Sequence, residues 1–394
     1  MKPAAVLDIG SSKIVCLSGS FADRDGIAVH GAAVRPYAGY IDGAFTDHRA
    51  LHTAIVDAVQ QAEQESRERI REIAVSVPAP FARLVMSEAA VPVNSKGKRV
   101  TTEEVDAVIS ASLKKVSAPG YVLMHSTPVS FTVGGVVMAD IPVGAKTDEL
   151  GALVSHMYVQ EEFVRAIEQV LSAIDVEISM CVSSELSNAL TIIPERERIR
   201  PAVLIDVGYT HTDVSLVENA ALTAAVTVPV GGRHITSDLC FGLDVPMESA
   251  EQVKRRYVFL QEPLSSTEIV RTPSGPKRVE HSAIELIIES RAGELVSLIR
   301  GALRTLGVSS EANPATYVTG GGLIMMKGAT EYLKANLQLP VKRDEPITQD
   351  MDTPNFTSAF AALDFVLRAI DDHEVVEVRT DGRVVDRLRN LFTK

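Results

Sequence analysis

Apolar and polar positions alternate along this chain in a way that predicts strands and helices in turn. The apolar runs that end at Asp8 and Asp206 predict buried strands, each followed by a polar turn and a strand of alternating character. When VLDIGSSKIVCL (6–17) is laid over VLIDVGYTHTDVSL (203–216), the two aspartates coincide and so do the glycines that follow them. A hairpin repeated once, far apart in the sequence, predicts a duplicated domain.

The stretch between the two hairpins predicts helices, a buried strand and an insert. Asp47–Ser66 has the periodicity of an amphipathic helix, and Glu72–Val77 reads as a buried strand. Residues 101–115 open with Thr-Thr-Glu-Glu, a helix-start pattern, and Val- and Phe-rich segments surround them. These features predict a small α+β insert over 81–160, followed by a helix over Glu161–Ala173.

The second half predicts a further insert, which begins near Ser237. Residues Gln261–Glu280 are polar and contain several prolines, so we expect a mobile loop there. His281–Leu306 has the periodicity of one long helix. Tyr317–Lys327 predicts a strand that runs into three glycines and then a helix, and Phe356–Ile370 predicts another helix.

Composition limits the kinds of protein that this chain can be. With 394 residues and 46% hydrophobic content, it can bury more than one core. Its net charge of -12 argues against nucleic acid as a partner. The three cysteines lie far apart, as expected for free thiols in a reducing cytoplasm. No signal peptide or membrane-spanning segment is expected, because no long apolar run occurs.

The two hairpins carry the first candidate chemistry. Each places a carboxylate, Asp8 or Asp206, at a strand end beside a turn whose backbone N–H groups can face a phosphate. Either hairpin alone could be an ordinary β-turn, but a matching pair predicts a polyphosphate site with Mg²⁺ near both carboxylates, bound through water. The side-chain donors are Ser11, Ser12 and Lys13 in the first turn, and Thr210, His211 and Thr212 in the second.

Two further motifs suggest contacts with a base or a ribose. Gly320, Gly321 and Gly322 stand between a predicted strand and a predicted helix, where glycine lets the backbone approach a ligand and a helix N-terminus favours phosphate. A glycine-rich turn without a ligand is the alternative. Glu251 and Lys254 lie one helical turn apart, as a surface ion pair does, and could also hold ribose hydroxyls.

The first hairpin, the second hairpin, the AExxK helix and the GGG turn follow one another in an order that resembles the actin-type ATPase superfamily. Within it, the 81–160 insert, the tail and VPVGGRHITSDL (228–239) resemble the FtsA family of bacterial cell-division proteins. The resemblance implies an α/β fold: a duplicated actin-like ATPase fold with an α+β insert in the first half and a C-terminal amphipathic helix.

The resemblance also implies a bound nucleotide, ATP with Mg²⁺. Glu185 stands where related filament proteins place a carboxylate that orients the attacking water, although a helix cap would explain it equally well. The usual second loop is Asp-x-Gly-Gly-Gly-Thr, whereas this chain has Tyr209, Thr210 and His211 after Gly208. We therefore expect slow or absent ATP turnover, with Asp8, Asp206 and Glu185 as the catalytic candidates. The implied nucleotide contacts are Ser11, Ser12, Lys13, Gly208, Tyr209, Thr210, Gly232, Glu251, Lys254, Gly320, Gly321 and Gly322.

The last residues predict a membrane contact. In RVVDRLRNLFTK (383–394) the apolar residues fall on one helical face and basic residues flank it, which suits an anionic membrane surface. A helix docked on the protein's own surface is the alternative, and the resemblance favours the membrane. The apolar face consists of Val384, Val385, Leu388, Leu391 and Phe392.

The resemblance further implies a domain plan and partners. The FtsZ C-terminal peptide would dock on the second insert, other division proteins on 81–160, and copies of the chain would form protofilaments on the inner face of the cell inner membrane at midcell. The expected parts are a first half (1–80, with 161–200 and about 341–370), the insert 81–160, a second half (201–236, with about 305–340), a partner-binding insert (237–304), a linker (371–382) and the membrane-targeting helix (383–394).

Two other functions fit the same fold. A small-molecule kinase would need a base for the substrate hydroxyl, and the first half offers no clear candidate. A PilM-type pilus-assembly adaptor shares the fold and the insert, but that family lacks the membrane helix. The tail therefore favours the cell-division adaptor.

Overall fold

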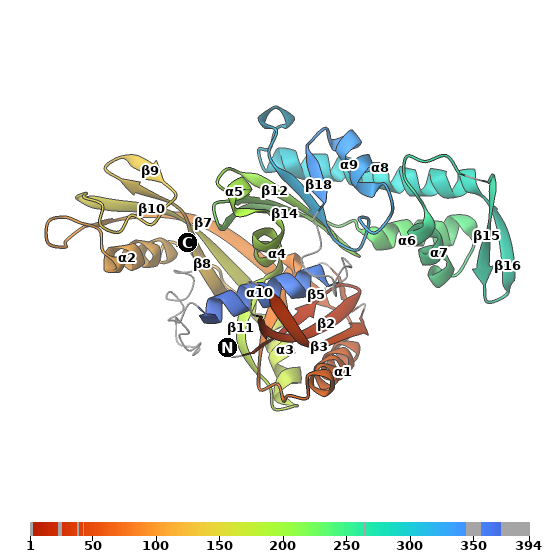
Figure 1. Ribbon diagram of the computed structural model, residues 1–394, viewed down its shortest axis with the longest axis horizontal. Coiled ribbons are helices and arrows are strands. Elements are labelled where there is room, and N and C mark those ends of the chain that lie inside the picture. The colour runs from red at the N-terminus through yellow and green to blue at the C-terminus, as the bar shows by residue number, and fades with distance from the viewer. Residues whose placement is uncertain are drawn as a thin grey trace. The chain divides into compact units, whose positions relative to one another are not determined.

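The computed structural model describes residues 3–22, 26–37, 39–41, 43–263, 265–343 and 356–371. Their contacts divide the chain into two compact units (Figure 1). None of the helices in these described ranges is both long enough and apolar enough to span a membrane. The predicted linker beyond residue 371 and the predicted helix 383–394 lie outside the described residues. Of the described residues, unit 1 takes those in 1–201, 217–224 and 358–394, and unit 2 takes the rest.

Unit 1 contains a five-stranded sheet in the order β11-β6-β1-β2-β3. Strands β1 and β2 are antiparallel, whereas β1, β6 and β11 run parallel. Every residue of β1 is buried, as its unbroken apolar run predicts. The strands are β1 (Ala4–Ile9), β2 (Lys13–Phe21), β3 (Ile27–Pro36), β6 (Glu72–Val77) and β11 (Glu177–Ser183). A short hairpin, β4 (Tyr40–Ile41) and β5 (Ala44–Phe45), follows β3.

Helices pack against this sheet at the places that the periodicity predicts. Helix α1 (His48–Ser66) lies against β2 and β3, and α3 (Glu161–Ser172) lies against α1 and β11. Asp47 caps α1 because its Oδ1 accepts the N–H of Ala50 at 2.8 Å. Helix α10 (Thr357–Asp371) confirms the predicted helix 356–370 within about a residue at each end.

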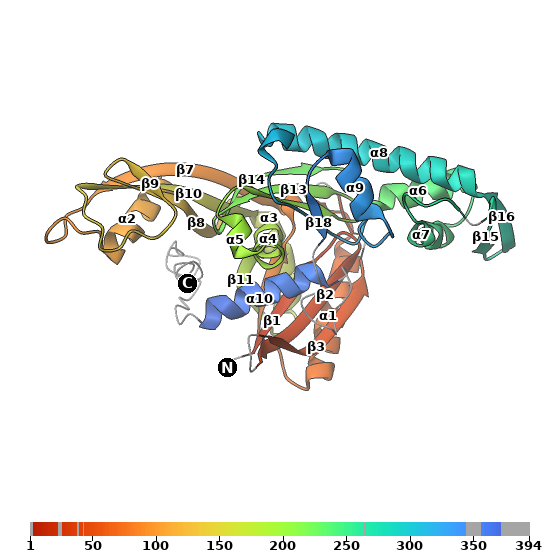
Figure 2. The same cartoon turned by 45° about the horizontal axis from the view of Figure 1, so that its top comes forward.

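The expected α+β insert of the first half is a four-stranded antiparallel sheet with one helix. The sheet order is β7-β10-β8-β9, and α2 (Thr102–Leu113) lies along β7 and β10 (Figure 2). The carboxylate of Glu104 accepts the backbone N–H of Thr101 at 2.9 Å, so the Thr-Thr-Glu-Glu pattern does form a capping box. The strands are β7 (Ala82–Pro92), β8 (Tyr121–Val133), β9 (Val136–Met138) and β10 (Glu149–Gln160), and a 3₁₀ turn, η1 (Ala79–Phe81), precedes them.

A second five-stranded sheet has the order β14-β13-β12-β17-β18, and most of its residues belong to unit 2, where helices pack against one core. The long helix predicted from periodicity is α8 (His281–Thr305), which packs against α6 and α9. The other elements are β12 (Ala202–Val207), β13 (Thr212–Glu218), β14 (Ala221–Val228), β17 (Thr316–Thr319), β18 (Val341–Arg343), α6 (Gly232–Leu243), α7 (Met247–Arg256), η2 (Ser310–Ala312) and α9 (Ala329–Leu337).

Two expectations for the second half are wrong in part. The predicted loop 261–280 contains an antiparallel hairpin of β15 (Thr267–Thr272) and β16 (Gly275–Glu280). Its prolines did not prevent strand formation, because Pro273 lies in the turn and a two-stranded sheet leaves each strand one free edge. The three glycines lead into a series of turns, and α9 begins only at Ala329. No helix N-terminus therefore stands directly at the glycines.

The charged connector 194–201 contains the short helix α5 (Glu195–Arg198). It follows α4 (Ser184–Ile192) closely, and the guanidinium of Arg198 donates to the carbonyl oxygen of Ile193 at 2.8 Å. Such a basic side chain satisfies a carbonyl at a helix C-terminus. The connector is thereby joined to the end of α4.

Candidate functional site

The two Asp-x-Gly hairpins have the same backbone geometry at their tips. In the β1–β2 turn the N–H of Gly10 donates to the carbonyl oxygen of Lys13 at 2.9 Å. In the β12–β13 turn the N–H of Gly208 donates to the carbonyl oxygen of His211, also at 2.9 Å. A Cβ on either glycine would lie within 3.0 Å of that carbonyl oxygen, so both positions favour glycine. The overlay predicted from the sequence is confirmed at the level of these two turns.

Asp8 is a buried carboxylate at the end of β1, 8% exposed. The hydroxyl of Ser358, on α10, donates to its Oδ1 at 3.0 Å. Burial raises the pKa of Asp8, while this hydrogen bond and the charge of Lys13 act in the opposite direction. No pattern in the sequence pointed to Ser358, because this contact joins residues at opposite ends of the chain.

The first turn is supported from β3. The backbone N–H of Tyr37, just after that strand, donates to the carbonyl oxygen of Ser12 at 3.0 Å. Ser11 is buried and Ser12 is half-buried. The turn is therefore held by the end of a neighbouring strand as well as by its own closing hydrogen bond. This role of Tyr37 could not be predicted from its residue type, because it uses the backbone N–H.

Glu185 lies at the same edge of the unit 1 sheet as Asp8. Strands β1, β6 and β11 are parallel, so their carboxyl ends share one edge, and Glu185 follows β11 in the first turn of α4. It is 7% exposed. Ser183 caps the helix, since its hydroxyl accepts the N–H of Leu186 at 3.2 Å. Ser183 thus holds the N-cap position, and Glu185 is the acidic residue in the first turn, where a carboxylate also stabilises a helix start. Its role in orienting water stays a prediction.

In unit 2 the glycines bring three backbone segments together. The N–H groups of Gly322, Gly232 and Arg233 donate to the carbonyl oxygens of residues 207, 208 and 209, at 2.8, 2.9 and 2.8 Å respectively. A Cβ on Gly322 would lie 2.0 Å from the carbonyl oxygen of Gly208, and one on Gly232 would lie 2.3 Å from that of Gly322. Close backbone packing alone thus requires glycine at both positions, whether or not a ligand approaches them.

Gly320 packs against the carboxylate that ends β12. Its φ is +96°, in the region that favours glycine, and a Cβ there would lie 2.3 Å from Oδ1 of Asp206. The GGG turn and the second hairpin are therefore one assembly. Its three loop carbonyls each accept a protein N–H group, which ties the second hairpin to the GGG turn and to the start of α6.

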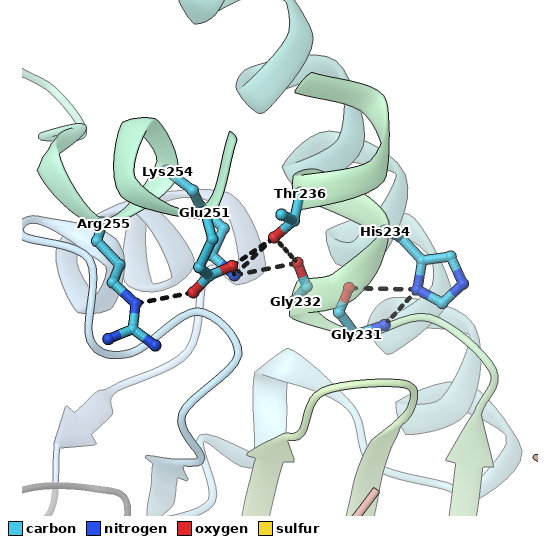
Figure 3. A network of polar contacts seen from close by, with 7 residues as sticks. All are labelled: Gly231, Gly232, His234, Thr236, Glu251, Lys254 and Arg255. Carbon is cyan, nitrogen blue, oxygen red and sulfur yellow. Dashed lines mark hydrogen bonds and ion pairs between the residues drawn. The ribbon is translucent and has the colours of Figure 1, made fainter. Parts of the chain in front are cut away.

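A polar network joins the start of α6 to α7 (Figure 3). Lys254 is 3% exposed, and its ammonium donates to the carbonyl of Gly232 at 3.2 Å, to the hydroxyl of Thr236 at 3.0 Å and to the carboxylate of Glu251 at 2.7 Å. All three of its N–H donors thus have acceptors. The expectation of a surface ion pair is wrong for Lys254, because its side chain is buried between two helices.

Glu251 is the more accessible member of this pair, with 27% of its side chain exposed. The hydroxyl of Thr236 donates to it at 2.6 Å, and the guanidinium of Arg255 donates at 2.8 Å. Burial would raise the pKa of Glu251, but Lys254 and these hydrogen bonds together lower it. Burial lowers the pKa of Lys254, against the charge of Glu251. A ribose contact by this pair stays a prediction.

A second polar chain begins at the tip of the second hairpin. His211 lies 3.0 Å from the hydroxyl of Thr210 through Nδ1, and 3.3 Å from the carboxylate of Asp213 through Nε2. Thr227, on β14, donates to the other oxygen of Asp213 at 2.6 Å. Asp213 and Thr227 were missed from the sequence, because their contact depends on strand register.

Comparison with known proteins gives one family. The model of the family "Cell division protein FtsA" matches residues 203–361. Cell division protein FtsA of Neisseria meningitidis is 25% identical over 369 residues, covering 91% of this chain and 89% of that protein. The protein of the same name from Pseudomonas aeruginosa is 23% identical over 376 residues, covering 93% and 89%. The resemblance to this family is confirmed.

Solved structures share the fold at low identity. A PilM–PilN type IV pilus biogenesis complex matches with a TM-score of 0.63 and 16% identity, over 92% of this chain and 98% of the other. MreB5 of Spiroplasma citri bound to ADP matches with a TM-score of 0.54 and 13% identity, over 94% and 99%. A MamK double helical filament matches at 0.53 and 13%, over 92% and 98%. The actin-like α/β fold is thereby confirmed.

Proposed function

The chain resembles cell division protein FtsA over most of its length, and from this premise we propose that it is an ATP-binding adaptor of bacterial cell division. The observation that carries the proposal is the pair of matching hairpin tips, each with a carboxylate before the glycine and a basic residue at the closing position. Duplicated turns of this kind suit a polyphosphate.

The donor set suits ATP with Mg²⁺. Lys13 and the hydroxyls of Ser11, Ser12 and Thr210 are phosphate donors, while Asp8 and Asp206 are the carboxylates that would hold Mg²⁺ through water. The metal would neutralise phosphate charge when bound. MreB5, which has the same fold, was solved bound to ADP.

Hydrolysis by this chain is expected to be slow or absent. Tyr209, Thr210 and His211 stand where the usual loop has two glycines and a threonine, so their side chains hold the backbone further from a terminal phosphate. The phosphate donors of the first turn, Ser11, Ser12 and Lys13, are not affected by these differences. Binding therefore survives the substitutions better than catalysis does.

The proposal includes a membrane and protein partners. Residues 383–394 form the basic amphipathic anchor for the anionic inner face of the cell membrane at midcell. Copies of the chain associate into protofilaments, and many weak anchors then add by avidity. MamK, which has the same fold, forms a double helical filament. The insert 237–304 takes the C-terminal peptide of FtsZ, and 81–160 takes other division proteins.

Co-sedimentation with anionic liposomes in the presence of ATP tests the adaptor function. The full chain is compared with a chain that ends at Gly382, with and without nucleotide. We expect only the full chain to pellet with the vesicles, and more of it with ATP. Equal behaviour of the two chains would contradict the anchor, and robust transfer of phosphate to common sugars would favour a kinase instead.

A further inference from the structure

Strand β8 of the insert 81–160 contains two β-bulges. Its residues pair with those of β10 one for one, except for Met124 and Val129, which have no partner on β10. A bulge interrupts the ladder of hydrogen bonds, bends its strand and increases the twist. Pro128 stands next to the second bulge, where the lack of a backbone N–H is tolerated. The segment 124–129 is therefore a short stretch of strand with a bend at each end.

This segment lies between two packed regions. Gly120, directly before β8, accepts the N–H of Glu161 at 3.0 Å, and Glu161 begins helix α3 of the first half. On the other side of the bulges, Phe131 is buried in the core of the insert. A bent strand between two cores is a place at which one of them can turn against the other.

The tip of the β13–β14 hairpin holds the bent segment. This tip belongs to unit 1, as the insert does, whereas the rest of both strands belongs to unit 2. The side-chain amide of Asn219 donates to the carbonyl oxygen of Val129 at 2.7 Å, so it satisfies a residue that the bulge leaves out of the ladder. Ser155, on β10, donates to the carbonyl oxygen of Leu222 at 2.6 Å. The hairpin tip is thus bonded to both strands at the base of the insert.

The same face of the sheet carries buried polar groups that this arrangement leaves unsatisfied. Thr127 stands opposite Ser155, and His125 lies two residues before Thr127, so the three side chains share one face. His125 is 5% exposed and Thr127 is 1% exposed. Neither ring nitrogen of His125, nor the hydroxyl of Thr127, has a hydrogen-bond partner among the described residues. Such groups favour an arrangement that water can reach.

We propose that the segment 124–129 is a hinge for the insert, and that the hydrogen bonds of Asn219 and Ser155 lock it. In the locked form the hairpin tip holds β8 and β10. When both bonds break, the insert turns and water reaches the His125 ring and the Thr127 hydroxyl. A protein that binds the insert then favours whichever form fits it. This inference goes beyond the proposed function and does not depend on nucleotide binding.

Double electron–electron resonance on the full chain measures the orientation of the insert. Spin labels on Lys96→Cys in the insert and on Gln60→Cys in α1 report one distance between the insert and the first half, in a chain that also carries Cys240→Ser. Burial raises the pKa of the Cys16 and Cys181 thiols to about 12, so these two react slowly with the label. The intact lock should give one narrow distribution of distances.

Two substitutions release the lock and a third favours it. Asn219→Gly removes the amide and keeps a residue that tolerates the φ of +55°, and Ser155→Ala removes the second bond. Each should raise the ratio of turned to locked insert about tenfold, and both together about a hundredfold, so that a second distance appears. Thr127→Val removes an unsatisfied hydroxyl at nearly constant shape and should reduce that second population about fivefold. Asn313→Gly, at another asparagine with positive φ, is the matched control and should change nothing.

A double variant with the same single narrow distribution as the intact lock would overturn the proposal. A second distance that Asn313→Gly also produces, or that Thr127→Val leaves undiminished, would overturn it as well. A further label pair, on Gln60→Cys and Glu177→Cys, lies within the first half and should keep its distance in every variant. Broadening of that distance would also contradict a hinge, because the first half itself would then have changed.

Discussion

Replacement of Gly322 by alanine should destabilise the protein even when no ligand is present. The new Cβ would lie 2.0 Å from the carbonyl oxygen of Gly208, 2.7 Å from that of Val207 and 2.9 Å from the nitrogen of Gly232. All three are backbone atoms, so no flexible side chain can move aside. The strands and turns that carry them must separate by about 1.4 Å or more to reach an ordinary contact distance.

The size of the effect follows from the bonds that this movement breaks. Gly322 donates to Val207 at 2.8 Å, and Gly232 donates to Gly208 at 2.9 Å. A buried hydrogen bond left unmade costs about 1–3 kcal/mol, and overpacking adds about 1–3 kcal/mol. We expect the free energy of unfolding to fall by about 4 kcal/mol, which lowers the melting temperature by about 10 °C.

Differential scanning calorimetry without nucleotide measures this, with Gly301→Ala as the matched control. Gly301 lies within α8, and a Cβ there would meet nothing within 4 Å. Alanine should therefore stabilise that helix by up to about 1 kcal/mol. If Gly322→Ala melts within about 2 °C of the unchanged protein, backbone packing does not explain the glycine, and close approach of a ligand becomes the better reason.

Three further changes test other parts of the structure. Burial lowers the pKa of His125 from 6.5 to about 4. Between these two pKa values the unfolded chain binds more protons than the folded chain, so the free energy of unfolding falls as pH falls. In urea unfolding the unchanged chain should lose about 2 kcal/mol more between pH 7.5 and 5 than His125→Met does, and an identical loss in the two proteins would refute the assignment. Lys254→Met leaves the Glu251 carboxylate without its ammonium and should lower stability by about 2–3 kcal/mol; thermal unfolding of the double variant with Glu251→Gln should recover part of it. Asp47→Ala should lower stability by about 1 kcal/mol, and Asp47→Ser should restore it, if the 2.8 Å contact with Ala50 is the cap.

The sequence predicted the features that local chemistry decides. The Asp-x-Gly hairpins, the start of α2 at Thr101 and the long helix α8 depend on residues near one another in the chain. The β15–β16 hairpin was missed because proline and glycine usually indicate a loop. Proline has no backbone N–H to donate, so it does not fit a strand that is paired on both sides. Among the described residues this sheet has two strands, so each strand keeps an edge that tolerates proline.

The site was predictable in its residue types and less so in their roles. Lys254 resembled one member of a surface ion pair because its i,i+3 spacing from Glu251 fits such a pair. The spacing does not reveal that another helix covers the Lys254 side chain. The glycines of the GGG turn were expected to open toward a ligand, whereas Gly322 packs on the backbone of the second hairpin. The contacts of Ser358 with Asp8 and of Thr227 with Asp213 arise only from packing and register.

Isothermal titration calorimetry with ATP and Mg²⁺ tests the central claim, that the duplicated turns bind a nucleotide. The full chain is compared with Lys13→Ala and with Lys146→Ala, which removes a lysine from the insert of the first half. We expect saturable binding, weakened about tenfold or more by Lys13→Ala and unchanged by Lys146→Ala. Absence of saturable binding, or equal affinity of all three proteins, would contradict it.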